Sequence, residues 1–191
     1  MKQIYEYEEK FFCSNSENII HFITENLNFS FKERVIEEDI YFQDPKKNYL
    51  TKTTCLRLRT TNNAQLELTS KRAANIQSRV KIERNLPLPH YKKERIISLL
   101  HRIGFSEYTT VFKERFIYTK TINNSTCNLM IDILNKKYTF LEIEFLTNKR
   151  NFNSLKKNME KIFARYKRYV HSAVILYFYD SCSVNGGLAW K

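Results

Sequence analysis

Alternating apolar and charged side chains recur along most of the chain. Because successive side chains of a β-strand point to opposite faces, this period of two separates the two faces of a predicted strand. In the opening segment 4–11 it places Glu6, Glu8 and Lys10 on one face. A run rich in β-branched and aromatic residues predicts another strand at 29–44. The alternation returns and predicts further strands at 54–60, 66–71, 79–83, 110–118, 128–134 and 140–146.

Helical spacing of apolar side chains appears between these strands. Ser14 or Ser16 can cap a helix whose apolar face ends near Leu27. A second helix is predicted over 91–103, and Gly104 is its stop signal.

The remaining segments are turns, a loop and the end of the chain. Asn62-Asn63 predicts a tight turn, and 44–52 is predicted to be a polar loop. A third helix, strongly basic on its outside, is predicted over about 152–169. The tail at 170–191 contains an apolar run, and the pattern leaves its structure unassigned.

Composition indicates one folded domain with an anionic partner. The chain has 191 residues, of which 42% are hydrophobic, and only 3 glycines and 3 prolines, so regular elements dominate. Its formal net charge of +12 favours binding to an anion. Charge alone leaves nucleic acid, a membrane surface and a polyphosphate open.

The cysteines predict neither a metal site nor a redox pair. Cys13, Cys55, Cys127 and Cys182 are widely separated, so we expect reduced thiols. The sequence shows no secretory signal and no apolar run long enough to cross a membrane, and it therefore predicts a soluble cytoplasmic protein with no membrane partner.

Two interpretations fit strands with one apolar and one charged face. An open sheet could expose its charged face to water. Like charges two residues apart repel unless opposite charges lie nearby, however, and such pairs recur here: Glu6/Glu8, Arg57/Arg59, Lys113/Arg115 and Glu142/Glu144. A closed antiparallel barrel with a polar lumen and helices packed outside accommodates them better. We therefore predict an α+β fold of this kind.

Acidic and basic groups in one lumen suit a metal-bound polyphosphate. Guanidinium and ammonium groups make charge-assisted hydrogen bonds to phosphate oxygens. Carboxylates repel phosphate but hold a hard divalent cation, which can bridge to phosphates. A groove dedicated to nucleic acid would need few of these acids.

The charged motifs follow a definite order over residues 1–168: Glu6-x-Glu8-x-Lys10, Asp39-Ile40-Tyr41-Phe42, Leu56-Arg57-Leu58-Arg59, Lys71, Arg79-x-x-x-Glu83, Gly104-Phe105, Lys113-x-Arg115, Asp132 and Glu142-x-Glu144. This ordered set resembles the CYTH superfamily of triphosphate tunnel metalloenzymes. Its members include class IV adenylyl cyclases, thiamine triphosphatases and inorganic triphosphatases. The resemblance implies an eight-stranded antiparallel β-barrel, the triphosphate tunnel, at 1–169, followed by the tail at 170–191.

The resemblance also implies roles for individual residues. Phosphate-binding residues would be Lys10, Arg57, Arg59, Lys71, Lys113 and Arg115, with Arg79 able to join them. Ligands of Mg²⁺ or Mn²⁺ would be Glu6, Glu8, Glu83, Asp132, Glu142 and Glu144. Tyr41 and Lys71 would form a catalytic dyad that orients or activates water.

Three departures from the family pattern leave the substrate branch open. The turn 135–138 lacks the usual glycine, segment 72–75 lacks the usual glycine and proline, and the run 170–179 does not match the cyclase ending.

We favour a metal-dependent triphosphatase acting on tripolyphosphate, thiamine triphosphate or a nucleoside triphosphate. The first alternative is a class IV adenylyl cyclase that makes cyclic AMP and pyrophosphate from ATP. The second is a non-catalytic binder of a polyphosphate, a nucleotide or an RNA 5′-triphosphate end. A homodimer is compatible with the family and is not decided by the sequence.

Overall fold

The structure is a computed structural model that describes residues 2–13, 20–51, 54–73, 80–122 and 125–147, together with Lys157 and Lys161. Apart from these two lysines, the basic helix predicted at 152–169 lies outside the described residues, as does the tail at 170–191.

Nine strands are present in the described part of the chain: β1 (Lys2–Cys13), β2 (Ser30–Gln43), β3 (Leu50–Thr51), β4 (Thr54–Thr61), β5 (Gln65–Ala73), β6 (Val80–Pro87), β7 (Ser106–Ile122), β8 (Ser125–Leu134) and β9 (Tyr138–Thr147). Each strand predicted by alternation or by β-branched content overlaps one of them. The prediction of a loop over 44–52 is wrong at its end, because Leu50 and Thr51 pair with Cys55 and Thr54 as β3.

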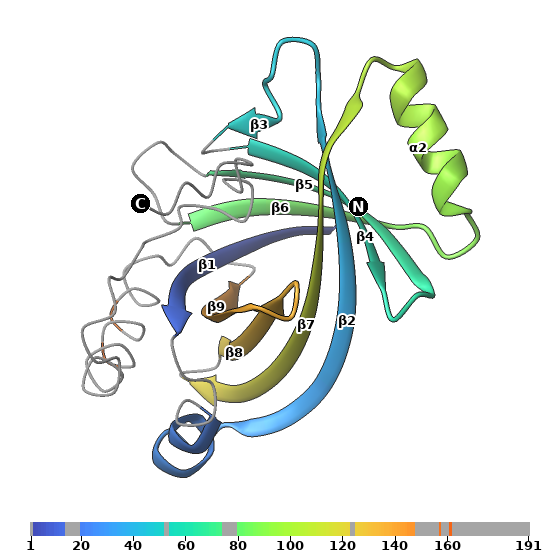
Figure 1. Cartoon of the computed structure of the whole chain (residues 1–191). Helices are drawn as coiled ribbons and strands as arrows, with labels where there is room; N and C mark the ends of the chain where they lie inside the picture. Colours follow the sequence, from blue (N-terminus) through green and yellow to red (C-terminus); the bar gives the residue numbers. More distant parts are fainter. Residues whose placement is uncertain are drawn as a thin grey trace, which may run out of the picture.

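The strands form one antiparallel sheet that curls around an interior (Figure 1). Their hydrogen-bonded order is β2-β7-β8-β9-β1-β6-β5-β4-β3, and β2 also pairs with β4. The pairing order therefore returns to β2. We call the space on the concave side of the sheet the lumen. Of the predicted eight-stranded antiparallel barrel, the antiparallel, curled sheet is confirmed.

Left-handed residues make the tight turns between strands. Asn62 and Asn63 have φ values of 50° and 57° in the β4–β5 turn, which confirms the turn predicted there. Asn135 and Lys136 have φ values of 49° and 58° in the β8–β9 turn. Asparagine tolerates this conformation, so this hairpin turns without the glycine that the family pattern has there.

The apolar face of β2, β4 and β5 packs against α2 (Lys93–Arg102), which lies along β2 and β4 in Figure 1. Ile96 and Leu100 of α2 are buried against Phe42 and Leu58 of the sheet. Gly104 has a φ of +95°, a conformation that favours glycine, and it ends the helix as predicted.

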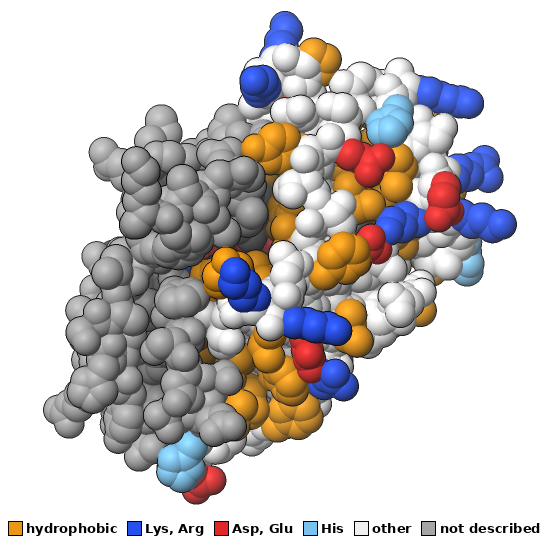
Figure 2. All heavy atoms as spheres, viewed as in Figure 1, with side chains coloured by type: hydrophobic (Ala, Val, Ile, Leu, Met, Phe, Trp, Pro, Cys, Tyr) orange, Lys and Arg blue, Asp and Glu red, His pale blue; other side chains and the backbone are white. Residues whose placement is uncertain are grey.

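The helix predicted before β2 is described only from residue 20 onward, where a π-helical segment, η1 (Phe22–Asn26), precedes the strand. No helix in the described residues is long and apolar enough to span a membrane. On the face in Figure 2, the basic side chains are scattered among hydrophobic ones and do not form one patch.

The expectation of reduced cysteines is wrong for Cys55 and for the cysteine bonded to it. Cys127 is buried and free, whereas Cys55 is disulfide-bonded.

Candidate active site in the lumen

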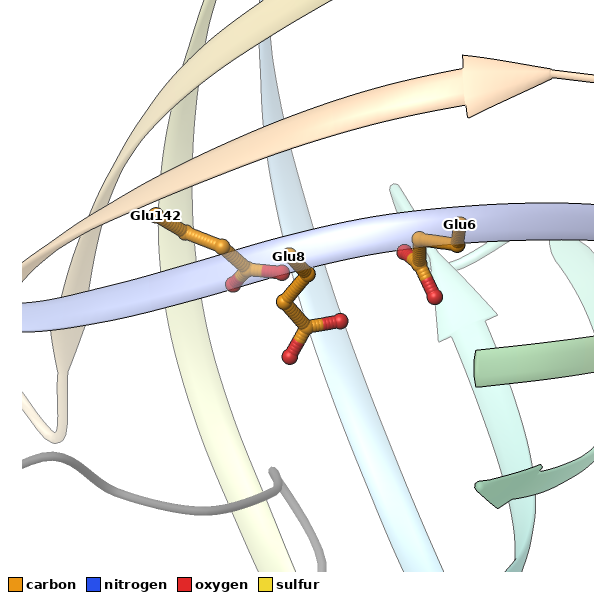
Figure 3. A group of neighbouring side chains, drawn as sticks. All are labelled: Glu6, Glu8 and Glu142. Atoms are coloured by element: carbon orange, nitrogen blue, oxygen red, sulfur yellow. The ribbon is translucent and has the colours of Figure 1, made fainter. Parts of the chain in front are cut away.

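An acidic cluster lies on adjacent strands at the lumen. Alternation along β1 turns Glu6 and Glu8 inward, and β9 contributes Glu142, which lies opposite Lys10 of β1. Carboxylate oxygens of Glu6, Glu8 and Glu142 lie within 4.8 Å of one another, and all three side chains are buried. Figure 3 shows Glu8 between the other two. We call these three residues the acidic cluster.

Two lysines contact the acidic cluster from β5 and β6. Lys71 Nζ lies 2.7 Å from Glu6 Oε2, 2.5 Å from Glu8 Oε2 and 3.7 Å from Glu83 Oε2. Lys81 Nζ donates a hydrogen bond to Glu8 Oε1 at 2.9 Å. Glu8 therefore binds one ammonium group with each oxygen.

On the β9 side of the acidic cluster, Glu142 contacts two further basic side chains. Lys10 Nζ lies 2.9 Å from Glu142 Oε2, and Arg115 Nη2 donates to the same oxygen at 2.8 Å. Arg115 also makes two hydrogen bonds of 2.6 Å to the carboxylate of Asp132. Asp132, a predicted metal ligand, is thus fully buried and engaged by an arginine.

Burial and neighbouring charges separate the pKa values of the cluster. Burial raises the pKa of Glu6 well above its ordinary value, although Lys71 opposes the shift. Burial also acts to raise the pKa of Glu8, but Lys71 and Lys81 outweigh it and hold that pKa below its ordinary value. Lys10 and Arg115 similarly outweigh burial and lower the pKa of Glu142. Two carboxylates are thus stabilised in the ionised form, and Glu6 in the protonated form.

Across the lumen, carboxylates of β2 hold the basic side chains of β4 and β7. Arg59 donates two hydrogen bonds to Asp39, at 2.6 and 2.8 Å, and one to Glu37 at 2.7 Å. Lys113 Nζ lies 3.0 Å from Glu37 Oε2 and 3.3 Å from Asp39 Oδ2. No role was predicted for Glu37 or Asp39 from the sequence. The signal was available, because Glu37, Asp39 and Tyr41 share one face of β2 by alternation.

Arg57 differs from the other arginines of the lumen. Its guanidinium is buried, and its ion pairs are long, at 3.7 Å to Asp39 and 3.9 Å to Glu83. Its Nε is buried without a hydrogen-bond partner in the described structure. An unsatisfied, charged donor of this kind is costly and suits a bound anion.

The predicted dyad flanks Cys55. Tyr41 is buried against Cys55 and Val111, and Cys55 lies opposite Lys71 in the β4–β5 pairing. Burial is the main cause that raises the pKa of Tyr41, so its hydroxyl keeps its proton at neutral pH.

The remaining predicted residues are placed as follows. Glu83 faces Lys71 and Arg57, and Glu144 is partly buried and accepts a hydrogen bond of 3.1 Å from Asn128. Arg79 lies outside the described residues. Within the described part, the closely spaced acidic group consists of Glu6, Glu8 and Glu142 and does not include Glu83, Asp132 or Glu144.

The cations of the lumen are already neutralised by the protein. A carboxylate lies within 4.0 Å of each of these residues: Lys10, Arg57, Arg59, Lys71, Lys81, Lys113 and Arg115. A polyphosphate that enters without a metal ion would therefore add negative charge that the lumen does not balance.

A family model described as the CYTH domain matches residues 5–174. The chain belongs to the CYTH family. This confirms the resemblance drawn from the ordered charged motifs. No curated protein sequence gives a significant match.

Solved structures share the fold of this CYTH chain. The PH1012 protein of Pyrococcus horikoshii OT3 is 29% identical, with a TM-score of 0.66 over 85% of this chain and 90% of that chain. An adenylate cyclase candidate from Vibrio parahaemolyticus is 17% identical, with a TM-score of 0.65 over 86% and 87%. HpAC1 of Hippeastrum, an adenylyl cyclase candidate described as having a dominant triphosphatase activity, is 15% identical, with a TM-score of 0.60 over 87% and 88%.

Proposed function

We propose that this CYTH protein is a hydrolase of triphosphate compounds that depends on Mg²⁺ or Mn²⁺ and releases phosphate in the lumen. The observation that carries the proposal is the presence, in one lumen, of a buried acidic cluster and of Arg57, whose buried Nε has no hydrogen-bond partner. The cluster suits a cation, and the arginine suits an anion. A metal-bound triphosphate satisfies both.

The residues of the acidic cluster fit a hard divalent cation. All three offer carboxylate oxygens, the ligands that Mg²⁺ and Mn²⁺ prefer. Glu6 Oε2 is buried and lies 2.7 Å from the ammonium group of Lys71, so this oxygen already faces a cation. We assign Glu6, Glu8 and Glu142 as the principal ligands, with Glu83, Asp132 and Glu144 completing the set. When bound, the cation neutralises phosphate charge and polarises the phosphoryl oxygens.

The basic residues of the lumen are assigned to the phosphates. Arg57 is the foremost of them because a phosphate oxygen satisfies its free Nε without breaking a hydrogen bond. Phosphate binding is further assigned to Lys10, Arg59, Arg79, Lys113 and Arg115. Glu37 and Asp39 hold Arg59 and Lys113 in position, so little side-chain entropy is lost when an anion binds.

Water attack is assigned to the region of Tyr41 and Lys71. Tyr41 keeps its hydroxyl proton and can donate or accept a hydrogen bond. Lys71 supplies a positive charge from β5, which is separated from β2 by β4. Together they would orient water for in-line attack on the terminal phosphorus, while the basic side chains stabilise the charge of the transition state.

The test is a substrate panel with the full chain. Tripolyphosphate, thiamine triphosphate, ATP and triphosphorylated RNA are each supplied with Mg²⁺, with Mn²⁺ or with a chelator. We expect metal-dependent release of orthophosphate from at least one of them. Cyclic AMP with an equal amount of pyrophosphate would instead identify a cyclase. Binding without turnover on every substrate would identify a sensor, and either result would overturn the proposal.

A further inference from the structure

We infer that Lys71 competes with the divalent cation, because its ammonium group occupies the cation position of the acidic cluster until a metal ion displaces it. The inference rests on the proposed function, since it takes the acidic cluster to be the metal site. It adds that metal binding is coupled to the release of a side chain assigned to catalysis.

The contacts of Lys71 match those that a cation would make. Its Nζ lies 2.7 Å from Glu6 and 2.5 Å from Glu8, two of the three carboxylates of the cluster. The lysine is 4% exposed, so water does not replace these contacts easily. Its strand β5 pairs with β4 and β6 on either side, so the backbone from which this side chain extends is fixed.

One ammonium satisfies the cluster incompletely. Lys71 reaches Glu6 and Glu8, whereas Glu142, the third carboxylate, is held by Lys10 and Arg115. A single positive charge also faces Glu8 and Glu83 as well as Glu6. A divalent cation brings twice the charge and binds carboxylate oxygens from several directions, so it is favoured at this position. It cannot share these oxygens with an ammonium at contact distance, because the two cations repel each other.

Displacement has a consequence for anion binding. An ammonium group released from the acidic cluster loses the negative charge of Glu8 inside a buried lumen, which is unfavourable unless an anion replaces it. Phosphate oxygens would supply that replacement. Metal and triphosphate should therefore each strengthen the binding of the other, with Lys71 as the link between them.

The test measures Mn²⁺ binding alone, without substrate, by electron paramagnetic resonance of the free ion. Lys71→Met removes the competitor. Lys113→Met is the matched control, because it removes an equally buried ammonium that contacts Glu37 and Asp39 and not the acidic cluster. We expect Lys71→Met to bind Mn²⁺ at least about tenfold more tightly than the wild type. The control should gain distinctly less.

The outcomes separate this inference from the proposed function. If the wild type and both variants fail to bind Mn²⁺, the metal site itself is refuted. If the wild type binds but Lys71→Met binds no more tightly, or gains no more than Lys113→Met, only the competition is refuted.

A second measurement on the wild type covers the case in which Lys71→Met does not fold. Mg²⁺ should raise the rate at which a small acylating reagent modifies Lys71, relative to Lys113, as measured by mass spectrometry of peptides. An unchanged ratio would overturn the inference.

Discussion

Arg57 and Arg59 lie two residues apart on β4, yet we expect the replacement of Arg59 to affect mainly stability and that of Arg57 mainly catalysis. Arg59 makes three hydrogen bonds of 2.6–2.8 Å to Asp39 and Glu37. Arg59→Met breaks this buried network, which typically costs about 3–5 kcal/mol of unfolding free energy. For a chain of this size, each kcal/mol lowers the melting temperature by about 2–4 °C. The expected decrease is therefore roughly 6–20 °C.

Arg57→Met should affect catalysis more than stability. Its ion pairs, at 3.7 and 3.9 Å, are longer than hydrogen bonds, so the loss of unfolding free energy should stay below about 1 kcal/mol. A hydrogen bond from a charged donor to a phosphate is worth about 1.5–3 kcal/mol. Its loss should lower kcat/KM for the best triphosphate substrate by roughly ten- to a hundredfold.

The assay pairs urea unfolding with steady-state release of orthophosphate for both variants and the wild type. Unfolding free energies compare the structural roles, and kcat/KM compares the catalytic ones. The reasoning is refuted if Arg57→Met is as unstable as Arg59→Met, or if Arg57→Met keeps wild-type kcat/KM.

Three further predictions concern the acidic residues. Glu8→Ala should abolish metal-dependent activity without loss of far-UV circular dichroism. Glu9→Ala should leave activity unchanged, because the sequence places Glu9 on the opposite face of β1. Equal losses of activity in the two variants would contradict the assignment of Glu8. Because burial raises the pKa of Glu6 above its ordinary value, Mn²⁺ affinity should weaken as pH falls through that raised value, and an Mn²⁺ affinity that does not change with pH would argue against Glu6 as a ligand. Lys113 outweighs burial and lowers the pKa of Glu37 to about 2, and Lys71 does the same for Glu83. The stability that these ion pairs contribute to the fold is therefore complete above the ordinary pKa of 4.5 and is lost as pH falls towards 2. Urea midpoints measured from pH 6 to 2.5 should decrease accordingly, and constant midpoints would contradict these ion pairs.

The strands and the lumen-facing charges could be predicted from the sequence because alternation is a local signal. Glu6, Glu8 and Glu142 could be assigned to one surface before any pairing was known. Glu37 and Asp39 could not be recognised as easily, because apolar residues such as Val35 and Ile40 dominate that stretch of β2.

Partners across the lumen could not be predicted, since they depend on register between strands far apart in sequence. Asp132 illustrates this, because its partner Arg115 follows from the β7–β8 pairing and not from either motif. The ion pairs of Lys71 with Glu6 and Glu8 likewise depend on the strand order β1–β6–β5, which brings these strands together.

The most direct test of the central claim follows the oxygen atom of the attacking water. The full chain is incubated with Mg²⁺ and its best triphosphate substrate in water enriched in ¹⁸O, and the products are measured by phosphorus NMR. Hydrolysis at the terminal phosphorus predicts orthophosphate that carries one ¹⁸O atom, with none in the remaining diphosphate. Unlabelled pyrophosphate formed together with cyclic AMP from ATP, or no product from any triphosphate with either metal, would contradict it.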